Sequence, residues 1–163
     1  MGSRIVGCAA CGRRNRVPAA AKGTPRCANC HNPLPWIADA DDRSFAEIVD
    51  RSELPVVVDL WATWCGPCRM VSPALEQVAR DMAGQIKLVK IDIDASPALA
   101  RRFEVQAVPT LLVMDHADVI ARQAGAAPAP ALRAWVQDAL RGAGPAAGRS
   151  GQEPSSTTKE ARS

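Results

Sequence analysis

The chain has 163 residues, of which 47% are hydrophobic and 23% charged, and its formal net charge is +3. This length suits one ordinary domain with a small accessory unit, and the hydrophobic share is enough to build a core. No apolar run approaches the roughly 18 residues of a membrane span, and the N-terminus has no apolar signal stretch. We therefore expect a cytoplasmic protein with no membrane partner.

Residues 1–32 are predicted to be a small loop-like unit. They contain four of the six cysteines and six cationic side chains but no acidic one, so the rest of the chain is formally −3. Because the segment has too few apolar side chains for a core of its own, it needs a metal or another cross-link to fold.

The four cysteines of this unit form two Cys-x-x-Cys pairs, Cys8/Cys11 and Cys27/Cys30, with fifteen residues between the pairs. This spacing matches a zinc pattern in which two tight turns supply four thiolates to a closed tetrahedral site. Structural disulfides are not expected in a reducing compartment. We predict a structural Zn²⁺ site here, with extra redox dithiols as the alternative and His31 as a competing ligand.

Residues 36–141 alternate strand and helix patterns and are predicted to form the main domain. The predicted elements are a short helix opened by the capping box Ser44-Phe-Ala-Glu47, a buried strand over 56–61, a helix over 67–82, a strand over 86–92, a helix opened by Ser96-Pro97, a strand over 110–114, an edge strand over 119–121 and a helix over 129–141. This order, βαβα followed by ββα, implies an α/β fold with a central mixed sheet and helices on both faces. Residues 142–163 lack large apolar side chains, and we predict a disordered tail.

The motif Trp64-Cys65-Gly66-Pro67-Cys68 lies where the first buried strand hands over to a helix. Free N–H groups and the dipole at a helix start stabilise an anion, so we expect an exposed thiolate on Cys65. Cys68 lies one turn further along the same face, within reach of a disulfide. Cys65 would attack a substrate disulfide, and Cys68 would then attack the mixed disulfide and release the product.

Asp59 interrupts the apolar strand that precedes this motif. A carboxyl group in such a strand is expected to be buried, and desolvation then raises its pKa. A pKa near the working pH suits general acid–base catalysis.

The segment from Val57 to Pro73, read Val-Val-Asp-Leu-Trp-Ala-Thr-Trp-Cys-Gly-Pro-Cys-Arg-Met-Val-Ser-Pro, resembles the active-site segment of thioredoxins. The similarity continues through Lys90-Ile-Asp-Ile-Asp94, Val108-Pro109-Thr110 and Gly125. With the two N-terminal cysteine pairs, the chain resembles the zinc-containing bacterial thioredoxin-2 branch. One departure is His116-Ala117, where thioredoxins commonly have an Asn-Gly turn.

The resemblance implies a thioredoxin fold with a zinc-ribbon-like N-terminal unit, and it implies roles for matching residues. Cys65 would be the attacking nucleophile and Cys68 the buried resolving thiol. Asp59 would move a proton to or from the resolving thiol, with Lys90 beside it. Pro109 would be a cis-proline opposite the disulfide. The implied substrate surface consists of Trp64, Gly66, Pro67, Val108, Pro109 and Gly125.

The resemblance also implies a protein-disulfide reductase that is recharged by an NADPH-dependent thioredoxin reductase. The clients would be disulfide-containing proteins, the chain itself would bind no nucleotide or flavin, and a monomer is expected. The Gly66-Pro67 dipeptide accompanies a low redox potential in this family, which argues for a reductant over the alternative of an isomerase or oxidant.

A different class of function is a zinc-ribbon module that recruits a redox domain to nucleic acid or to an acidic protein. Arg13, Arg14 and Arg16 could make such contacts. Because no aromatic residue is interleaved with them, we favour a solvated basic loop and expect no nucleic-acid partner.

Overall fold

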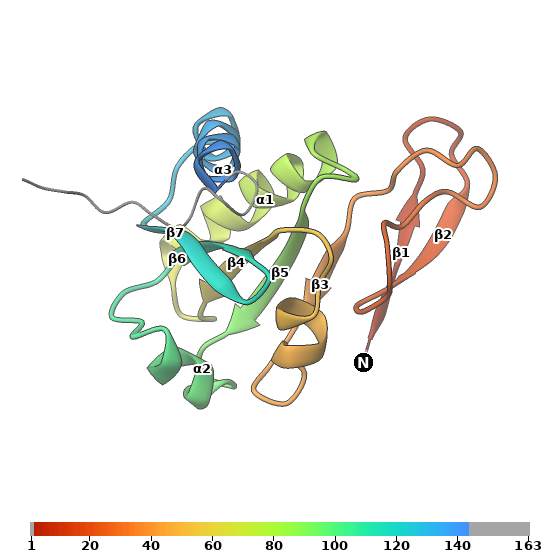
Figure 1. The fold of residues 1–163 in the computed structure, drawn as a ribbon. Coiled ribbons are helices and arrows are strands. Elements are labelled where there is room, and N and C mark those ends of the chain that lie inside the picture. The colour runs from red at the N-terminus through yellow and green to blue at the C-terminus, as the bar shows by residue number, and fades with distance from the viewer. Residues whose placement is uncertain (1, 144–163) are drawn as a thin grey trace, which may run out of the picture.

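A computed structural model of the chain describes residues 2–143 (Figure 1). The elements in chain order are β1 (Ser3–Gly7), β2 (Arg14–Pro18), β3 (Ile37–Asp39), the single π-turn η1 (Ala46–Asp50), β4 (Val56–Trp61), α1 (Gly66–Asp81), β5 (Lys87–Asp92), α2 (Pro97–Arg102), β6 (Thr110–Asp115), β7 (Asp118–Ala124) and α3 (Ala129–Ala143). Among these described residues, no helix is long and apolar enough to cross a bilayer. The predicted tail begins too early, because residues 142 and 143 complete α3, and the rest of it lies outside the described residues.

The central sheet has five strands in the order β3-β5-β4-β6-β7. Strands β3, β5 and β4 are parallel, whereas β6 and β7 are antiparallel to their neighbours, so the predicted mixed sheet is confirmed. Helices α1 and α3 cover one face, and η1 and α2 cover the other (Figure 1). Strand β3 was not predicted, because three residues are too short to show a strand pattern.

The two cores are built from alternating residues of the same strands. In β4, Val56, Val58 and Leu60 belong to the core under η1 and α2, whereas Val57 belongs to the core under α1 and α3. Side chains alternate along a strand, so Asp59 lies on the α1 side. By the same alternation in β5, Lys90 shares the side of Leu88, which also packs under α1.

Two helix caps differ from the prediction. The capping box at η1 is formed by Asp41 and Ser44: Asp41 Oδ1 accepts the Ser44 N–H, and Ser44 Oγ accepts the Asp41 N–H. Glu47, the expected partner of Ser44, instead pairs with Arg51. The capping box therefore lies three residues earlier than the sequence indicated, in the turn that precedes η1.

The second difference is at α2. Pro97 opens this helix as predicted, but Ser96 makes no capping hydrogen bond. The carboxylate of Asp42 accepts the N–H groups of Ala98 and Leu99 at 3.0 and 2.9 Å. A residue more than fifty positions away in sequence therefore fills the role that Ser96 was expected to have.

The N-terminal unit is more ordered than predicted. Its β1 and β2 form an antiparallel hairpin, which stands beside the β3 edge of the main sheet (Figure 1). A small apolar cluster fills its interior, made of Cys8, Val17, Cys27, Leu34 and Trp36. The expectation of a loop without a core was wrong because Leu34 and Trp36, which follow the unit in sequence, fold back into it.

The turn between β6 and β7 keeps a tight hairpin despite its unusual sequence. His116 and Ala117 have φ angles of 49° and 73°. Two central residues with positive φ match the hairpin turn that Asn-Gly commonly forms. The departure at this turn therefore leaves the hairpin intact, and β7 extends beyond the predicted 119–121 to residues 118–124.

Candidate functional site

Cys65 and Cys68 form a disulfide at the start of α1, with their Cα atoms 5.4 Å apart. Cys65 is the N-cap of the helix, and its sulfur accepts the N–H of Cys68 at 3.1 Å. The sulfur therefore occupies the position where helix N–H groups and the helix dipole stabilise a thiolate once the bond is reduced.

The expectation of an exposed Cys65 is wrong for this disulfide form. Only 3% of Cys65 and 4% of Cys68 is exposed. Both cysteines belong to a small cluster with Ala62, against which Trp61 and Val108 pack. Burial therefore does not distinguish an attacking from a resolving cysteine, whereas the N-cap position of Cys65 does.

The loop before β6 lies against the disulfide. The Val108–Pro109 peptide bond is cis, as the resemblance implied, and Val108 packs on the cysteine cluster. Gly125, with φ of 91°, donates its N–H to the carbonyl of Pro109 at 2.9 Å. The structure thus brings Val108, Pro109 and Gly125 together at one side of the redox pair.

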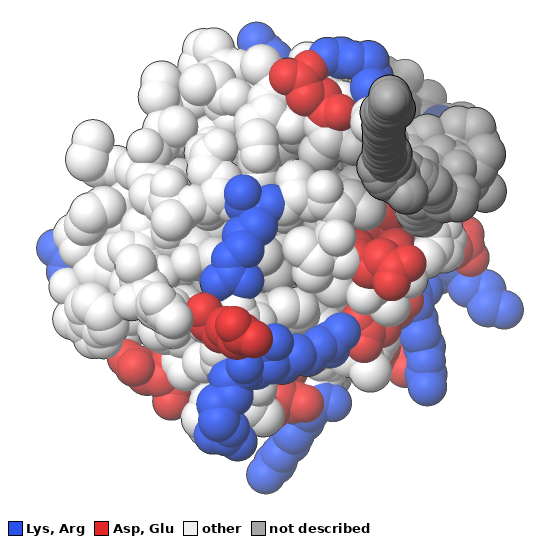
Figure 2. All heavy atoms as spheres, turned by 60° about the vertical axis from the view of Figure 1, so that its left-hand side comes forward, with Lys and Arg blue, Asp and Glu red and all other residues white. Residues whose placement is uncertain are grey.

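Exposed apolar side chains precede and follow the two cysteines along the chain. Trp64 is 67% exposed, and its indole N–H is held by Asp94 Oδ2 at 2.9 Å. Met70, which the sequence did not single out, is 72% exposed on α1. The face of the molecule that Figure 2 brings forward shows a broad, largely uncharged area at its upper left.

Asp59 is fully buried, as its place in an apolar strand indicated. Neither of its carboxylate oxygens has a hydrogen-bond partner among the described residues. Desolvation raises the pKa of Asp59 to about 6, with Lys90 opposing the rise and Glu76 adding to it. A carboxyl with this pKa changes protonation close to neutral pH.

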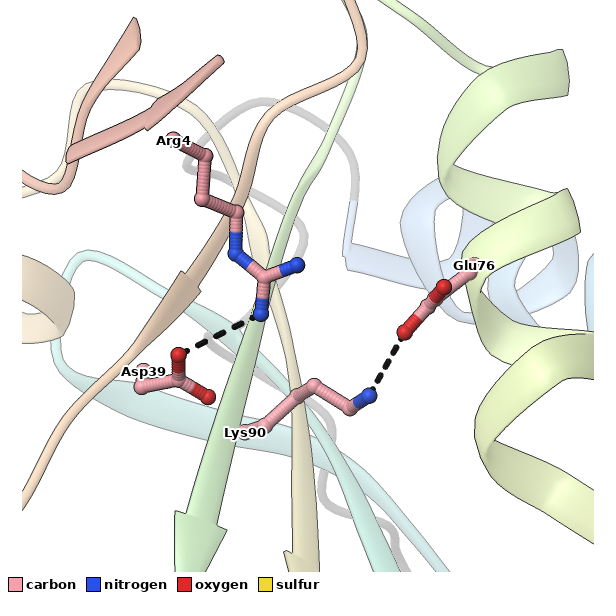
Figure 3. A network of polar contacts seen from close by, with 4 residues as sticks. All are labelled: Arg4, Asp39, Glu76 and Lys90. Carbon is pink, nitrogen blue, oxygen red and sulfur yellow. Dashed lines mark hydrogen bonds and ion pairs between the residues drawn. The ribbon is translucent and has the colours of Figure 1, made fainter. Parts of the chain in front are cut away.

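Lys90 is the register partner of Asp59 across β4 and β5. Its ammonium group forms an ion pair of 2.6 Å with Glu76 of α1, which the sequence did not single out (Figure 3). On the other side of Lys90, Arg4 of β1 pairs with Asp39 of β3 at 3.2 Å (Figure 3). Lys90 thus lies between the Glu76 carboxylate and the Arg4–Asp39 ion pair (Figure 3).

A cavity of about 350 Å³ opens beside these pairs. It is lined by Asp39, Trp61, Ala62, Thr63, Cys68, Arg69, Ser72 and Lys90. Because Cys68 and Lys90 share this cavity, solvent can reach the region of the second cysteine from the α1 side.

The four N-terminal cysteines converge as their spacing predicts. The sulfurs of Cys8, Cys11, Cys27 and Cys30 all lie within 4.8 Å of one another. Cys8 and Cys30 are 3.5 Å apart, and Cys11 and Cys27 are 3.6 Å apart, between sulfurs. Zn–S bonds of about 2.3 Å in a tetrahedron place sulfurs roughly 3.8 Å apart, so this set fits a Cys₄ metal site. His31 is not part of it.

Asn15 is a further residue at this cluster that no sequence pattern indicated. Its side chain is buried, donates to the Cys27 sulfur at 3.6 Å and accepts the N–H of Ala28 at 2.9 Å. Backbone N–H groups, of Cys30 first and of Asn29, lower the pKa of Cys27 to about 6. This sulfur is therefore prepared to bind a metal as a thiolate.

Comparisons with known proteins agree with this architecture. A family model described as Thioredoxin matches residues 36–138. Thioredoxin C-3 of Corynebacterium nephridii is 38% identical over 141 residues, covering 84% of this chain and 96% of that protein. A bifunctional thioredoxin reductase/thioredoxin of Mycobacterium leprae is 39% identical over 63% of this chain and 22% of its own length. The crystal structure of chloroplastic thioredoxin z matches with a TM-score of 0.60 and 31% identity, over 66% of this chain and 96% of that one.

Proposed function

Because this chain belongs to the thioredoxin family and is a thiol–disulfide oxidoreductase, we propose that it reduces disulfide bonds in client proteins. The observation that carries the proposal is the Cys65–Cys68 disulfide at the N-terminus of α1. A dithiol in that position can exchange two electrons with another disulfide.

In the proposed first step, the Cys65 thiolate attacks one sulfur of a client disulfide. A mixed disulfide forms between Cys65 and the client, and the other client sulfur leaves as a thiolate. In the second step, Cys68 attacks the Cys65 sulfur, so the second client thiolate is released. The client gains two electrons and the chain is left as the Cys65–Cys68 disulfide.

The second step requires Cys68 to lose a proton. We assign this proton to the carboxylate of Asp59, which faces α1, the helix that carries Cys68. With a pKa of about 6, Asp59 is largely ionised near neutral pH and can accept a proton there. Lys90 is proposed to favour the ionised form of this carboxylate, because its positive charge lies opposite Asp59 in the adjacent strand.

The client surface is proposed to surround the disulfide. Trp64 gives a large exposed apolar contact, and Gly66, which has no side chain, and Pro67 lie between the two cysteines at the helix start. The backbone N–H and C=O of Val108 can pair with an extended client segment, as in strand addition. Pro109 has no N–H, and its carbonyl accepts the Gly125 N–H, so Gly125 supports that loop.

Turnover requires a donor that reduces the Cys65–Cys68 disulfide again. We propose an NADPH-dependent thioredoxin reductase as this partner. One relative is named a bifunctional thioredoxin reductase/thioredoxin, and this name supports the pairing of the two activities.

The four N-terminal cysteines are proposed to bind one structural Zn²⁺. The sulfur geometry and the thiol chemistry of the set support this metal. With four protein ligands the ion has no open position for substrate, so its contribution is to fold residues 1–32 rather than to take part in exchange.

Insulin reduction with the reductase and NADPH tests the proposed activity. We expect turnover with the native chain, none with Cys65→Ser, and with Cys68→Ser a stable mixed disulfide that mass spectrometry can identify. Turnover by Cys65→Ser at the native rate would refute the assignment. A potential above about −200 mV, titrated against glutathione, would favour an oxidant or isomerase instead.

A further inference from the structure

A groove of about 320 Å³ runs along β2, between this strand and residues 21–28. Its lining includes five cationic residues and no acidic one: Arg13, Arg14, Arg16, Lys22 and Arg26. The lining also includes Leu34 and Trp36, each of which is only 1% exposed. We propose that this basic groove is a binding site for a small anion that carries phosphate groups.

The charges in the basic groove have no acidic partner among the described residues. Arg16 donates to the hydroxyl of Ser3, and Arg26 donates to the carbonyl of His31. The ion pairs of arginines lie elsewhere, as in Arg4–Asp39 and Arg133–Asp81. Glu53 borders the groove, where it accepts the Gly23 N–H at 3.0 Å, but it forms no ion pair with a groove cation. The five cations therefore outnumber the acidic groups beside them, and a bound anion relieves their mutual repulsion.

The proposed metal site does not neutralise this charge. Four thiolates around one divalent ion carry a formal charge of −2. Residues 1–32 contain six cationic side chains and no acidic one, so that they keep a formal charge of +4 with the metal bound. This surplus of positive charge favours the binding of an anionic ligand.

The free edge of β2 adds backbone donors to the basic groove. The N–H of Cys8 donates to the Arg13 carbonyl, and the N–H of Ala19 donates to the Gly2 carbonyl. Cys8/Arg13 and Gly2/Ala19 are therefore hydrogen-bonded pairs of the hairpin. Such pairs alternate along an antiparallel ladder, so the N–H groups of Arg14 and Arg16 face away from β1. Guanidinium groups and free backbone N–H groups are the donors that bind phosphate oxygens in proteins.

The size and lining of the groove favour a small anion over a nucleic acid. Its volume is at the lower end of the range for small-molecule sites. Its one aromatic residue, Trp36, is buried, and its indole N–H already bonds to the Pro18 carbonyl. No ring is therefore offered for base stacking, on which binding of single strands depends.

Inorganic phosphate titrated into the ¹⁵N-labelled, zinc-loaded full chain tests the proposal by NMR. We expect saturable shifts of the Arg14, Arg16 and Lys22 amide signals, beyond those of sodium chloride at equal ionic strength. The double variant Arg14→Gln/Lys22→Gln should lose at least about tenfold in affinity. Arg101→Gln/Arg141→Gln, which removes the same charge from α2 and α3 and leaves the groove lining intact, should bind as the native chain does.

Zinc content near one per chain shows that each variant keeps its N-terminal unit. Shifts that do not saturate, or equal affinity in the groove variant and the native chain, would overturn the site. Pyrophosphate, a short single-stranded DNA and a polyglutamate peptide are titrated in the same way. Tighter binding of the DNA or the peptide than of pyrophosphate would overturn the assignment to a small anion.

Discussion

The ammonium group of Lys87 lies 4.1 Å from the centre of the Trp36 ring, and each of these two residues is only 1% exposed. Lys87 belongs to β5 and donates to the Ile48 carbonyl at 2.7 Å, while Trp36 donates to the Pro18 carbonyl at 2.9 Å. A single buried contact thus connects the redox sheet, η1 and the N-terminal unit. A desolvated cation over an indole face is a favourable pair.

Lys87→Met is expected to alter the pH dependence of stability. Burial lowers the pKa of Lys87 to about 8, from 10.5. Between these values the unfolded chain holds a proton that the folded chain lacks, so the native chain gains stability as the pH rises. We expect its free energy of unfolding to rise by up to about 3 kcal/mol relative to Lys87→Met from pH 8 to 10.5.

Urea unfolding of both chains across this pH range measures the difference. Lys22→Met, at an exposed lysine, is the matched control and should follow the native curve. The same pH dependence in Lys87→Met and in the native chain would show that Lys87 keeps an ordinary pKa in the fold.

Asp59→Asn is expected to stabilise the protein at neutral pH. Desolvation raises the pKa of Asp59 from 3.8 to about 6, so the folded state favours the protonated form. Stability from this group is present below pH 4 and is lost as the pH rises through 6. The free energy of unfolding of the variant should therefore exceed that of the native chain by up to about 3 kcal/mol at pH 7, and should not exceed it below pH 4.

Calorimetry at pH 4 and pH 7 checks this expectation, with exposed Asp118→Asn as control. The same variant should release client from the mixed disulfide more slowly, because it cannot accept the proton of Cys68. Unchanged stability at both pH values would mean that Asp59 is solvated.

Asn15→Ala is expected to weaken zinc binding without removing a ligand. The amide holds the Cys27 sulfur and the Ala28 N–H in place. Loss of such a supporting contact commonly lowers metal affinity by about 10- to 100-fold. Competition with a coloured chelator on the full chain measures the affinity, with exposed Asn32→Ala as control. Equal affinity in both variants would exclude this role for Asn15.

Trp64→Ala is expected to impair protein clients more than small ones. The side chain is 67% exposed beside the disulfide, where a client can cover it. Loss of one large aromatic contact corresponds to about a tenfold fall in kcat/KM for insulin. Reduction of a small aromatic disulfide should change by less than about twofold. Ile5→Ala, at another exposed apolar residue, should change neither rate, and an equal fall for both substrates would argue against client contact.

Structural features that depend on residues close together in the sequence could be predicted well. The strand around Val57, the helix that starts after Cys65 and the burial of Asp59 follow from local hydrophobic patterns and from the chemistry of a strand-to-helix junction. The convergence of four cysteines followed from their spacing, since each Cys-x-x-Cys turn presents two sulfurs together. The cis state of Pro109 came from the family resemblance and not from a local pattern.

By itself, then, the sequence determined the redox motif, the metal-type cysteine pattern and most of the elements, because these signals act within a few residues. Only the tertiary structure decided that Asp42 caps α2, that Glu76 pairs with Lys90, and that Lys87 is buried under Trp36. Such partners are far apart in sequence and meet only after the two cores have packed. Packing sets their burial and charge environment, and these in turn set the proton affinity of Asp59 and Lys87.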